Sequence, residues 1–538
     1  MISNPKFQKV FFAFVIGSSF VWFRLQSISA KNSFNPDEAE LLANAKRAAI
    51  SLVPYKNYTT PTYGVVWPYF LVVMNKLGLP LTIPMAHLLS CLIGVSVSLL
   101  LLFAIQKYLG NSLGFIAVFP FTLMWAIGIG DSDFQSLSTE LLPLLLITIG
   151  AYIASRENAP NRYILVASCL VGAGAWAKYS FAPISFVILG VFVFLLTKKN
   201  GKFLRQTLLV GISANIIFLI IFGIALFTVR PKHLVWETFE FTFRYIGQGG
   251  LSTAEPPSTA FRISALGGNI VKCFPLVVLF FLVAISFEVK KKPQNKFLKN
   301  IAVAVFATGM ISSLILWPVF PHYNLLIICS GVAGILLVPT LYSTFDANCL
   351  EKNSPNSKII SYVSLLSLVL VAVLYAPSIT SNQLTTSQIT TRTPWMTKSA
   401  TWERATTKEG SPLSKTCTPG SKVVVWGWSS ELYSYYDWMP ASRYVNTVIL
   451  MFPNELNTNP VKYRENFTRE IYNDEPDCII DATGPSFFPG YGPEKQMSAQ
   501  MPELWKKLQK TYRQYQFFYD GVNPFEVLVR EENIAISE

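Results

Sequence analysis

The feature that most constrains this chain is a series of apolar runs along its first 379 residues. Each run is long enough to cross about 30 Å of hydrocarbon as a helix. Only 14% of all residues are charged and 51% are hydrophobic, which excludes an ordinary soluble protein and an intrinsically disordered one. The runs predict a polytopic α-helical membrane protein with about eleven transmembrane helices. These spans are expected at 9–28, 85–106, 111–130, 136–155, 162–178, 180–197, 206–229, 264–287, 300–318, 323–342 and 359–377.

The charge distribution predicts how these spans are oriented. Residues 1–379 carry 28 Lys and Arg against 13 Asp and Glu, whereas residues 380–538 carry 16 against 18. With the N-terminus in the cytoplasm, the basic residues gather in the cytoplasmic connections, as the positive-inside rule requires. The basic excess therefore indicates membrane orientation and no nucleic-acid partner. We expect an integral membrane protein whose C-terminal domain is extracytoplasmic. One alternative stays open, namely that residues 1–30 are a cleaved signal peptide.

Composition and periodicity divide the chain into three parts. A transmembrane domain over 1–379 is followed by a linker rich in Thr, Ser and Pro over 380–420 and by an α/β domain over 421–538. In this last part strands alternate with helices, which is typical of a small α/β domain. Strands are expected at 422–428, 477–481, 515–518 and 524–530, and helices at 430–438, 466–472 and 502–515.

Two extracytoplasmic loops, 31–84 and 230–263, are too long to be simple turns. Apolar residues recur at helical spacing from Asp37 to Ile50 and again from Val65 to Leu77. This pattern predicts two amphipathic helices on the outer membrane surface. The apolar face of the first of these helices is formed by Ala39, Leu42, Ala45 and Ala49.

The seven cysteines are scattered and contain no Cys-x-x-Cys pair, which excludes the common zinc and redox motifs. Cys417 and Cys478 lie in the C-terminal part, and they can pair only if their compartment is oxidising. Two free buried thiols are the commoner outcome, and the sequence leaves the choice open.

Acidic residues at the ends of spans are functional candidates, because ionisable groups at membrane depth are costly. In the segment Asn35-Pro-Asp37-Glu38 after the first span, Asp37 can cap the surface helix. It can also face outward and take a proton from an acceptor, and the two roles are compatible. Asp133 and Glu140 lie seven residues apart, so they share one face if the fourth span is helical from residue 133. Glu140 would then lie one or two turns inside the span and would need a partner.

Basic and aromatic residues mark the same side of the membrane. Lys178, at the outer end of the fifth span, breaks the positive-inside trend and either snorkels or pairs with an outer acid or a lipid phosphate. His322 and Tyr323 open the tenth span, either as interfacial aromatic residues or as phosphate ligands at a helix start. The loop 230–263 contains Arg244 and suits an anionic head group. The chain has no P-loop and no Gly-x-Gly-x-x-Gly motif, so a cytosolic nucleotide site has no support.

The order of these motifs resembles the GT-C superfamily of integral-membrane glycosyltransferases. The likeness is to bacterial relatives of the protein O-mannosyltransferases and of the aminoarabinose transferases that modify lipid A. It covers most of the chain. The residues that carry it are Asn35-Pro-Asp-Glu-Ala39, Thr62-Tyr-Gly-Val-Val-Trp-Pro-Tyr69, the acid of the fourth span, His322-Tyr323, Val425-Trp-Gly-Trp428 and Ala441-Ser-Arg-Tyr444.

The resemblance implies inverting transfer of a sugar from a polyprenyl phosphate to an acceptor hydroxyl on the outer face. Asp37 matches the general base, with Glu38 as second choice. Lys178, His322 and Tyr323 match, by position, the groups that hold the leaving phosphate. This requires Asp37 and His322 on the walls of one cavity open to the outer leaflet. The full expected substrate-binding set is Asp133, Glu140, Lys178, Arg244, His322 and Tyr323.

Two matters of chemistry stay open within this resemblance. Some relatives use a divalent cation near the outer acids, and Asp37 with Asp133 could bind Mg²⁺ or Mn²⁺ through oxygen ligands, but we assign no metal ligand. The chain departs from the aminoarabinose transferases at Ala177-Lys-Tyr-Ser180, where they usually have a Thr-Lys-Gly-Pro-like segment. It departs again at His322, where Arg often precedes the late Tyr. These departures bear on the donor phosphate and on the sugar.

Other functions are compatible with the same pattern. The acceptor can be a glycolipid, a polysaccharide or a protein hydroxyl. A transporter or flippase of lipid-linked glycan would share the outer basic groups and the apolar bulk, although the spans show no paired broken helices of inverted repeats. A non-catalytic membrane scaffold whose outer domain binds a partner is the third alternative.

Overall fold

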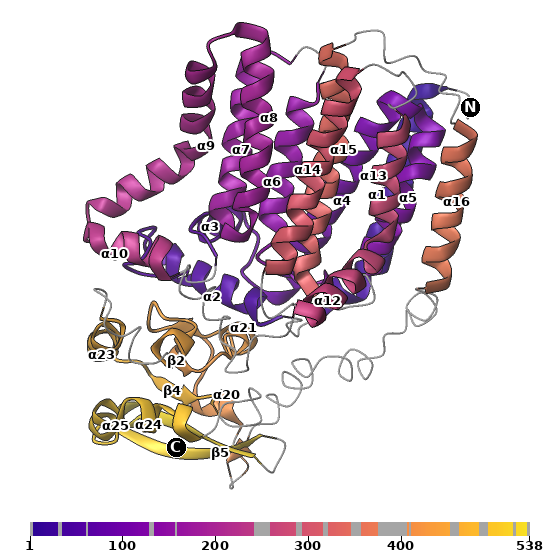
Figure 1. The fold of residues 1–538 in the computed structure, drawn as a ribbon. Coiled ribbons are helices and arrows are strands. Elements are labelled where there is room, and N and C mark those ends of the chain that lie inside the picture. The colour runs from indigo at the N-terminus through magenta and orange to yellow at the C-terminus, as the bar shows by residue number, and fades with distance from the viewer. Residues whose placement is uncertain are drawn as a thin grey trace. The chain divides into compact units, whose positions relative to one another are not determined.

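The chain folds into two compact units (Figure 1). Unit 1 comprises Met1–Ser29, His87–Ile220 and Glu255–Leu384, and unit 2 comprises Ala30–Ala86, Ile221–Ala254 and Thr385–Glu538. The computed structural model describes residues 4–30, 35–60, 63–128, 134–156, 159–241, 259–286, 293–315, 321–345, 357–374, 406–407, 410, 412–451, 462–483, 493–519 and 523–534.

Unit 1 is a bundle of apolar helices that run side by side (Figure 1). Neighbours in the bundle include the pairs α6–α7, α14–α15 and α6–α15. The helices are α1 (Pro5–Ser29), α4 (Ile83–Leu109), α5 (Asn111–Ala126), α6 (Leu141–Ala154), α7 (Asn161–Ala177), α8 (Ala182–Asn200), α9 (Phe203–Leu226), α12 (Thr259–Lys272), α13 (Phe274–Ser286), α14 (Pro293–Ile315), α15 (Asn324–Phe345) and α16 (Ser357–Leu374), with the 3-10 turns η2 (Tyr179–Phe181) and η4 (Pro321–Tyr323).

Each predicted span falls on one of these helices, with a single exception. The run 264–287 is divided at Cys273 into α12 and α13. By length and composition, four described helices are able to cross a membrane, namely Pro5–Ser29, Ile83–Leu109, Tyr179–Asn200 and Phe203–Leu226. The apolar stretches found in the other described helices are shorter, for example Asn300–Ser313 within α14 and Asn324–Val338 within α15, so the number of eleven spans stays a prediction.

Small residues allow close contact between helices in the bundle. A Cβ added at Gly172 of α7 would overlap the carbonyl group of Ala214 in α9. A Cβ at Gly309 of α14 would overlap the Ser330 side chain of α15. Such close approach is the usual means of helix association where lipid removes the hydrophobic driving force.

Unit 2 is built on a mixed six-stranded sheet with the order β1-β5-β6-β4-β2-β3. The central strands β4 and β2 are parallel, as are β2 and β3, and the pairs β4–β6, β6–β5 and β5–β1 are antiparallel. The predicted helix 502–515 is too long, because Tyr512 to Tyr515 pair with β6 instead. The strands are β1 (Thr406–Thr407), β2 (Lys422–Trp426), β3 (Met439–Pro440), β4 (Cys478–Asp481), β5 (Tyr512–Tyr519) and β6 (Asn523–Arg530).

Both faces of this sheet are covered. Side chains alternate along β2, so that Val424 and Trp426 pack with α23 and α25, whereas Val423 and Val425 pack with α21. The helices and turns of unit 2 are α2 (Pro36–Ile50), α3 (Val66–Lys76), α10 (Pro231–Val235), the π-helical turn η3 (Trp236–Glu240), α20 (Leu413–Thr416), α21 (Glu431–Tyr435), η6 (Thr447–Met451), α23 (Tyr463–Asp474), η7 (Pro493–Lys495), α24 (Met497–Gln500), α25 (Pro502–Leu508) and α26 (Glu531–Ile534).

Segments from both long loops belong to the core of unit 2. Ala43 of α2 packs in the cluster on one face of the sheet, and Trp236 and Phe241 pack in the cluster on the other. Helix α2 is buried on more than one side, and only Ala49 of its expected apolar face is exposed. The expected helix α2 therefore forms, but a packed sheet covers part of it. Its position on a membrane surface stays a prediction.

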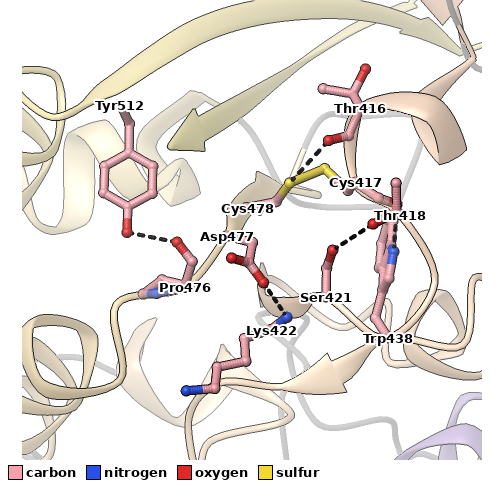
Figure 2. Close-up of a disulfide and its surroundings, with 10 residues drawn as sticks. All are labelled: Thr416, Cys417, Thr418, Ser421, Lys422, Trp438, Pro476, Asp477, Cys478 and Tyr512. Carbon is pink, nitrogen blue, oxygen red and sulfur yellow. Dashed lines mark hydrogen bonds between the residues drawn. A yellow bond between two sulfur atoms is a disulfide. The ribbon is translucent and has the colours of Figure 1, made fainter. Parts of the chain in front are cut away.

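A disulfide joins Cys417 and Cys478, whose Cα atoms are 6.2 Å apart (Figure 2). The bond ties the end of α20 to the start of β4, and the Trp438 indole donates a hydrogen bond of 2.8 Å to the Cys417 carbonyl beside it. The pairing is thus the outcome that the sequence left open as the less common one. A persistent disulfide is typical of an oxidising compartment.

Replacing Cys417 with serine is expected to lower the free energy of unfolding of unit 2 by about 2–4 kcal/mol, because the cross-link closes a long loop in the unfolded chain. The two cysteines are 61 residues apart. Urea unfolding followed by tryptophan fluorescence, with and without reductant, measures the change. Reductant should lower the urea midpoint of the wild type to that of Cys417→Ser, and it should not change the midpoint of the variant. Equal midpoints under all four conditions would contradict the prediction.

Candidate active site

A buried cluster of charged side chains lies in unit 1 where α6 begins and α7 ends. The Lys178 ammonium lies 3.3 Å from Glu140 Oε1 and donates a hydrogen bond of 2.7 Å to Thr139 Oγ1. The Thr139 hydroxyl in turn donates to Glu140 Oε2 at 3.1 Å. Lys178 is 6% exposed and Glu140 is fully buried. The three side chains form a closed ring of polar contacts in a poorly solvated place, where charges act more strongly than in water.

His322 joins this cluster from a distant part of the chain. Its Nε2 lies 4.0 Å from Glu140 Oε2, and the residue is buried. The imidazole packs edge-on against the ring of Tyr323, with centroids 4.7 Å apart, and Tyr323 is partly exposed. Three residues of the expected substrate-binding set, Glu140, Lys178 and His322, therefore lie together in the fold.

The start of α6 corrects one sequence prediction. The helix begins at Leu141, so residue 140 lies directly before its first turn and not one or two turns inside a span. Ser138 and Thr139 favour turns over a helix interior, because their hydroxyls compete with the backbone for hydrogen bonds. Pro143 has no N–H and is tolerated in the first turn. The Glu140 carboxylate thus lies at a helix N-terminus, which favours negative charge, and Lys178 lies at a helix C-terminus, which favours positive charge.

Arg24 of α1 was not identified from the sequence. It is 1% exposed, and its guanidinium donates to the carbonyls of Trp125, Ala126 and Phe134 at 2.9–3.0 Å. It therefore caps the end of α5 and holds the segment that leads to Glu140. The sequence did contain a signal for this role, namely a lone arginine near the end of an apolar run. Charged residues in such a position usually pair with groups inside the protein.

The two expected catalytic acids lie in unit 2, at the start of α2. Asn35 makes the helix cap, because its Oδ1 accepts the Asp37 N–H at 2.8 Å while Pro36 occupies the first turn. The capping role considered for Asp37 is therefore filled by its neighbour. Asp37 is partly exposed, whereas Glu38 is fully buried. Of the two residues, Asp37 is the more exposed.

Two expected residues, Asp133 and Arg244, lie outside the described residues. Across the ranges that the structure does describe, no three His, Cys, Asp or Glu side chains gather in a way that could hold a metal ion. The described residues thus supply no ligand set for the Mg²⁺ or Mn²⁺ considered above, and no chemical step below passes through a metal.

Unit 2 contains a second buried polar cluster around Arg443, a residue that the sequence marked as a candidate for a structural or acceptor-facing contact. Arg443 pairs with Glu470 at 2.9 Å and donates a hydrogen bond to the Tyr55 carbonyl. Glu237, which is 1% exposed, faces the positive charge of Arg443 and the hydroxyl of Tyr463. The cluster joins the Tyr55 loop and η3 to the C-terminal domain, so it holds together segments that are far apart in the sequence.

Glu237 makes the stability of unit 2 depend on pH. Burial raises the pKa of Glu237 from 4.5 to about 7, and the Arg443 charge and the Tyr463 hydroxyl act in the opposite direction. Because the folded chain binds this proton more tightly than the unfolded chain, the contribution of Glu237 to the stability of unit 2 is greatest at low pH. It falls by about 3 kcal/mol as the pH rises through the interval between the two values.

Glu237→Gln is expected to remove this loss, so the variant gains stability over the wild type as pH rises. Urea unfolding at about pH 5 and about pH 8 measures the difference. If the urea midpoint changed equally with pH in the wild type and in Glu237→Gln, the pH dependence would not come from Glu237.

The arrangement of helices and sheet gives the chain the GT-C fold that it shares with solved ArnT structures. Two solved structures of ArnT, an aminoarabinose transferase from Cupriavidus metallidurans, share this fold. The structure bound to undecaprenyl phosphate has a TM-score of 0.55 at 13% identity, and the apo structure has 0.53 at 14%. Each match covers 98% of both chains. No protein-family model and no curated protein sequence matches the chain.

Proposed function

We propose that this protein transfers a sugar, with inversion, from a polyprenyl-phosphate donor to an acceptor hydroxyl on the extracytoplasmic face of the membrane. The observation that carries the proposal is the buried cluster of Lys178, Glu140 and His322. A fold shared with an ArnT structure that holds undecaprenyl phosphate supports the same donor class.

The cluster suits a leaving group that departs as a phosphate anion. Preorganised cations and donors in a poorly solvated site stabilise developing negative charge more than water does. Lys178 supplies the cation, and His322 and Tyr323 supply donors at the start of α15. Glu140 neutralises Lys178 while no donor is bound, because an unpaired ammonium would be costly to bury.

Asp37 is the proposed general base. The acceptor hydroxyl attacks the anomeric carbon on the side opposite the phosphate, so the configuration inverts, and its proton passes to the Asp37 carboxylate. The C–O bond to phosphate breaks as the new glycosidic bond forms. Asp37 belongs to unit 2, and the residues proposed to hold the phosphate belong to unit 1.

The proposed location is the bacterial inner membrane, with the N-terminus in the cytoplasm and the C-terminal domain outside. The charge bias of the first 379 residues supports this orientation. The disulfide between Cys417 and Cys478 supports it independently, because the cytosol keeps most thiols reduced.

Sugar transfer by the reconstituted protein tests the proposal. The full chain in nanodiscs receives a radiolabelled polyprenyl-phosphate sugar and one acceptor at a time: lipid A, another glycolipid, a polysaccharide or a Ser/Thr-rich peptide. Label should move to one acceptor with inverted anomeric configuration. Movement of intact labelled lipid across a vesicle bilayer, with no label on any acceptor, would identify a flippase instead.

A further inference from the structure

Helix α2, which carries Asp37, is joined to the C-terminal domain along one stripe of its surface. Glu40, Ala43, Lys46 and Arg47 all contact that domain. These positions are spaced by three and four residues, so they lie on neighbouring turns of one face. The hydrogen-bond partners of Lys46 and Glu40 are 391 and 406 positions away in the sequence, and they belong to unit 2.

A buried hydrogen bond lies at the N-terminal end of this stripe. Glu40 Oε2 accepts from Asn446 Nδ2 at 2.8 Å, and the two residues are 2% and 8% exposed. The Asn446 side chain is itself held, since its Oδ1 accepts the Val448 N–H at 3.1 Å. Burying a carboxylate against a neutral amide is a costly way to gain stability. It does, however, fix a single geometry, because the bond is directional.

The C-terminal end of the stripe is held by two basic residues. Lys46 Nζ donates to the carbonyls of Tyr433 and Trp438 at 3.2 and 3.3 Å and pairs with Asp437 at 2.9 Å. Arg47 NH1 donates to the Pro440 carbonyl at 3.3 Å. These contacts anchor α2 to the segment that runs from α21 to β3, so both ends of the stripe are fixed.

We infer that the C-terminal domain is the scaffold that orients the catalytic helix, with Glu40 as the positioning residue for Asp37. This inference rests on the proposed role of Asp37 as the base. Asp37 and Glu40 are three residues apart and lie one above the other on the helix surface. The bond from Asn446 therefore fixes the rotation of α2 and the direction in which the Asp37 carboxylate points. A displacement of about 1 Å at a reacting group can cost about 100-fold in rate.

Two truncations and one conservative change at this contact test the inference. Glu40→Ala and Asn446→Ala remove the hydrogen bond, whereas Glu40→Gln keeps an acceptor oxygen for Asn446. In the nanodisc assay both truncations should lower kcat by about 10- to 100-fold with an unchanged KM for the donor. Glu40→Gln should restore kcat to within a few-fold of the wild type. Hydrogen–deuterium exchange should become faster in residues 36–50 of the truncated variants, independently of activity.

The matched control is Glu465→Gln, which alters an exposed carboxylate of unit 2 paired only with Lys462 at the surface among the described contacts. It should change neither kcat nor exchange in α2. Should Glu40→Ala fail to fold, Lys46→Met removes one of the two basic residues that hold the other end of the stripe, at a less buried position. Wild-type kcat together with unchanged α2 exchange in the truncated variants would overturn the inference. If the wild type transfers no sugar, the proposed function fails, and the exchange data alone decide whether the domain holds α2.

Discussion

Replacing Asp37 with asparagine is expected to lower kcat for sugar transfer by about 10²- to 10⁴-fold, the usual contribution of a general base. Asparagine keeps the size of the side chain but cannot accept the proton of the acceptor hydroxyl. The cap of α2 should survive, because Asn35 and not Asp37 provides it. Affinity for the donor should also survive, since the side chains proposed to bind the donor phosphate lie on other elements. Initial rates with labelled donor, combined with donor binding measured separately, distinguish the two effects.

Glu503→Gln is the control for this change, because it neutralises an exposed carboxylate on α25. It should transfer sugar at the wild-type rate. A wild-type rate for Asp37→Asn would show that the base lies elsewhere. If Glu38→Gln and not Asp37→Asn lowered the rate of sugar transfer, the general base would be the buried carboxylate of Glu38.

Replacing Lys178 with methionine is expected to abolish transfer and to destabilise unit 1. The change leaves Glu140 buried without its cation, and breaking one side of a buried ion pair costs about 3–5 kcal/mol. It also removes the proposed counter-ion of the leaving phosphate. The thermal midpoint in nanodiscs and the affinity for undecaprenyl phosphate should therefore both fall.

The double variant Lys178→Met/Glu140→Gln separates these two consequences. With both charges removed, the midpoint should recover toward that of the wild type, whereas phosphate affinity and transfer should not. Lys9→Met, at an exposed lysine of α1, is the control and should behave as wild type. A double variant that transfers sugar at the wild-type rate would contradict the role of Lys178. A single variant as stable as the wild type would contradict the buried pair.

Local pattern was a reliable guide to where helices and strands lie, but less so to where they begin and end. The expected strand 477–481 corresponds to β4, and the expected span 162–178 corresponds to α7. The start of α6 was placed several residues too early. Hydropathy does not separate an apolar helix from the buried turn before it, and α6 begins only at Leu141.

The sequence predicted several residues of the candidate site, but it did not predict which of them contact one another. Lys178 and His322 were selected because charged or titratable groups near span ends are costly. That both approach one carboxylate, Glu140, follows from the packing of α6 against both α7 and α15. Thr139, which bonds to both Lys178 and Glu140, carries no signal in the sequence at all.

The sequence by itself determined that the chain is rich in apolar helices, that its basic residues are biased to one set of connections, and that an α/β segment follows. Hydrophobic period and charge are properties of neighbouring residues, so they can be read along a single segment. Only the tertiary structure decided that residues 36–50 and 231–241 belong to the same compact unit as the C-terminal sheet. The contact between Glu40 and Asn446 spans 406 positions. Such a contact depends on shape and directional bonding in the folded chain, and no local pattern encodes it.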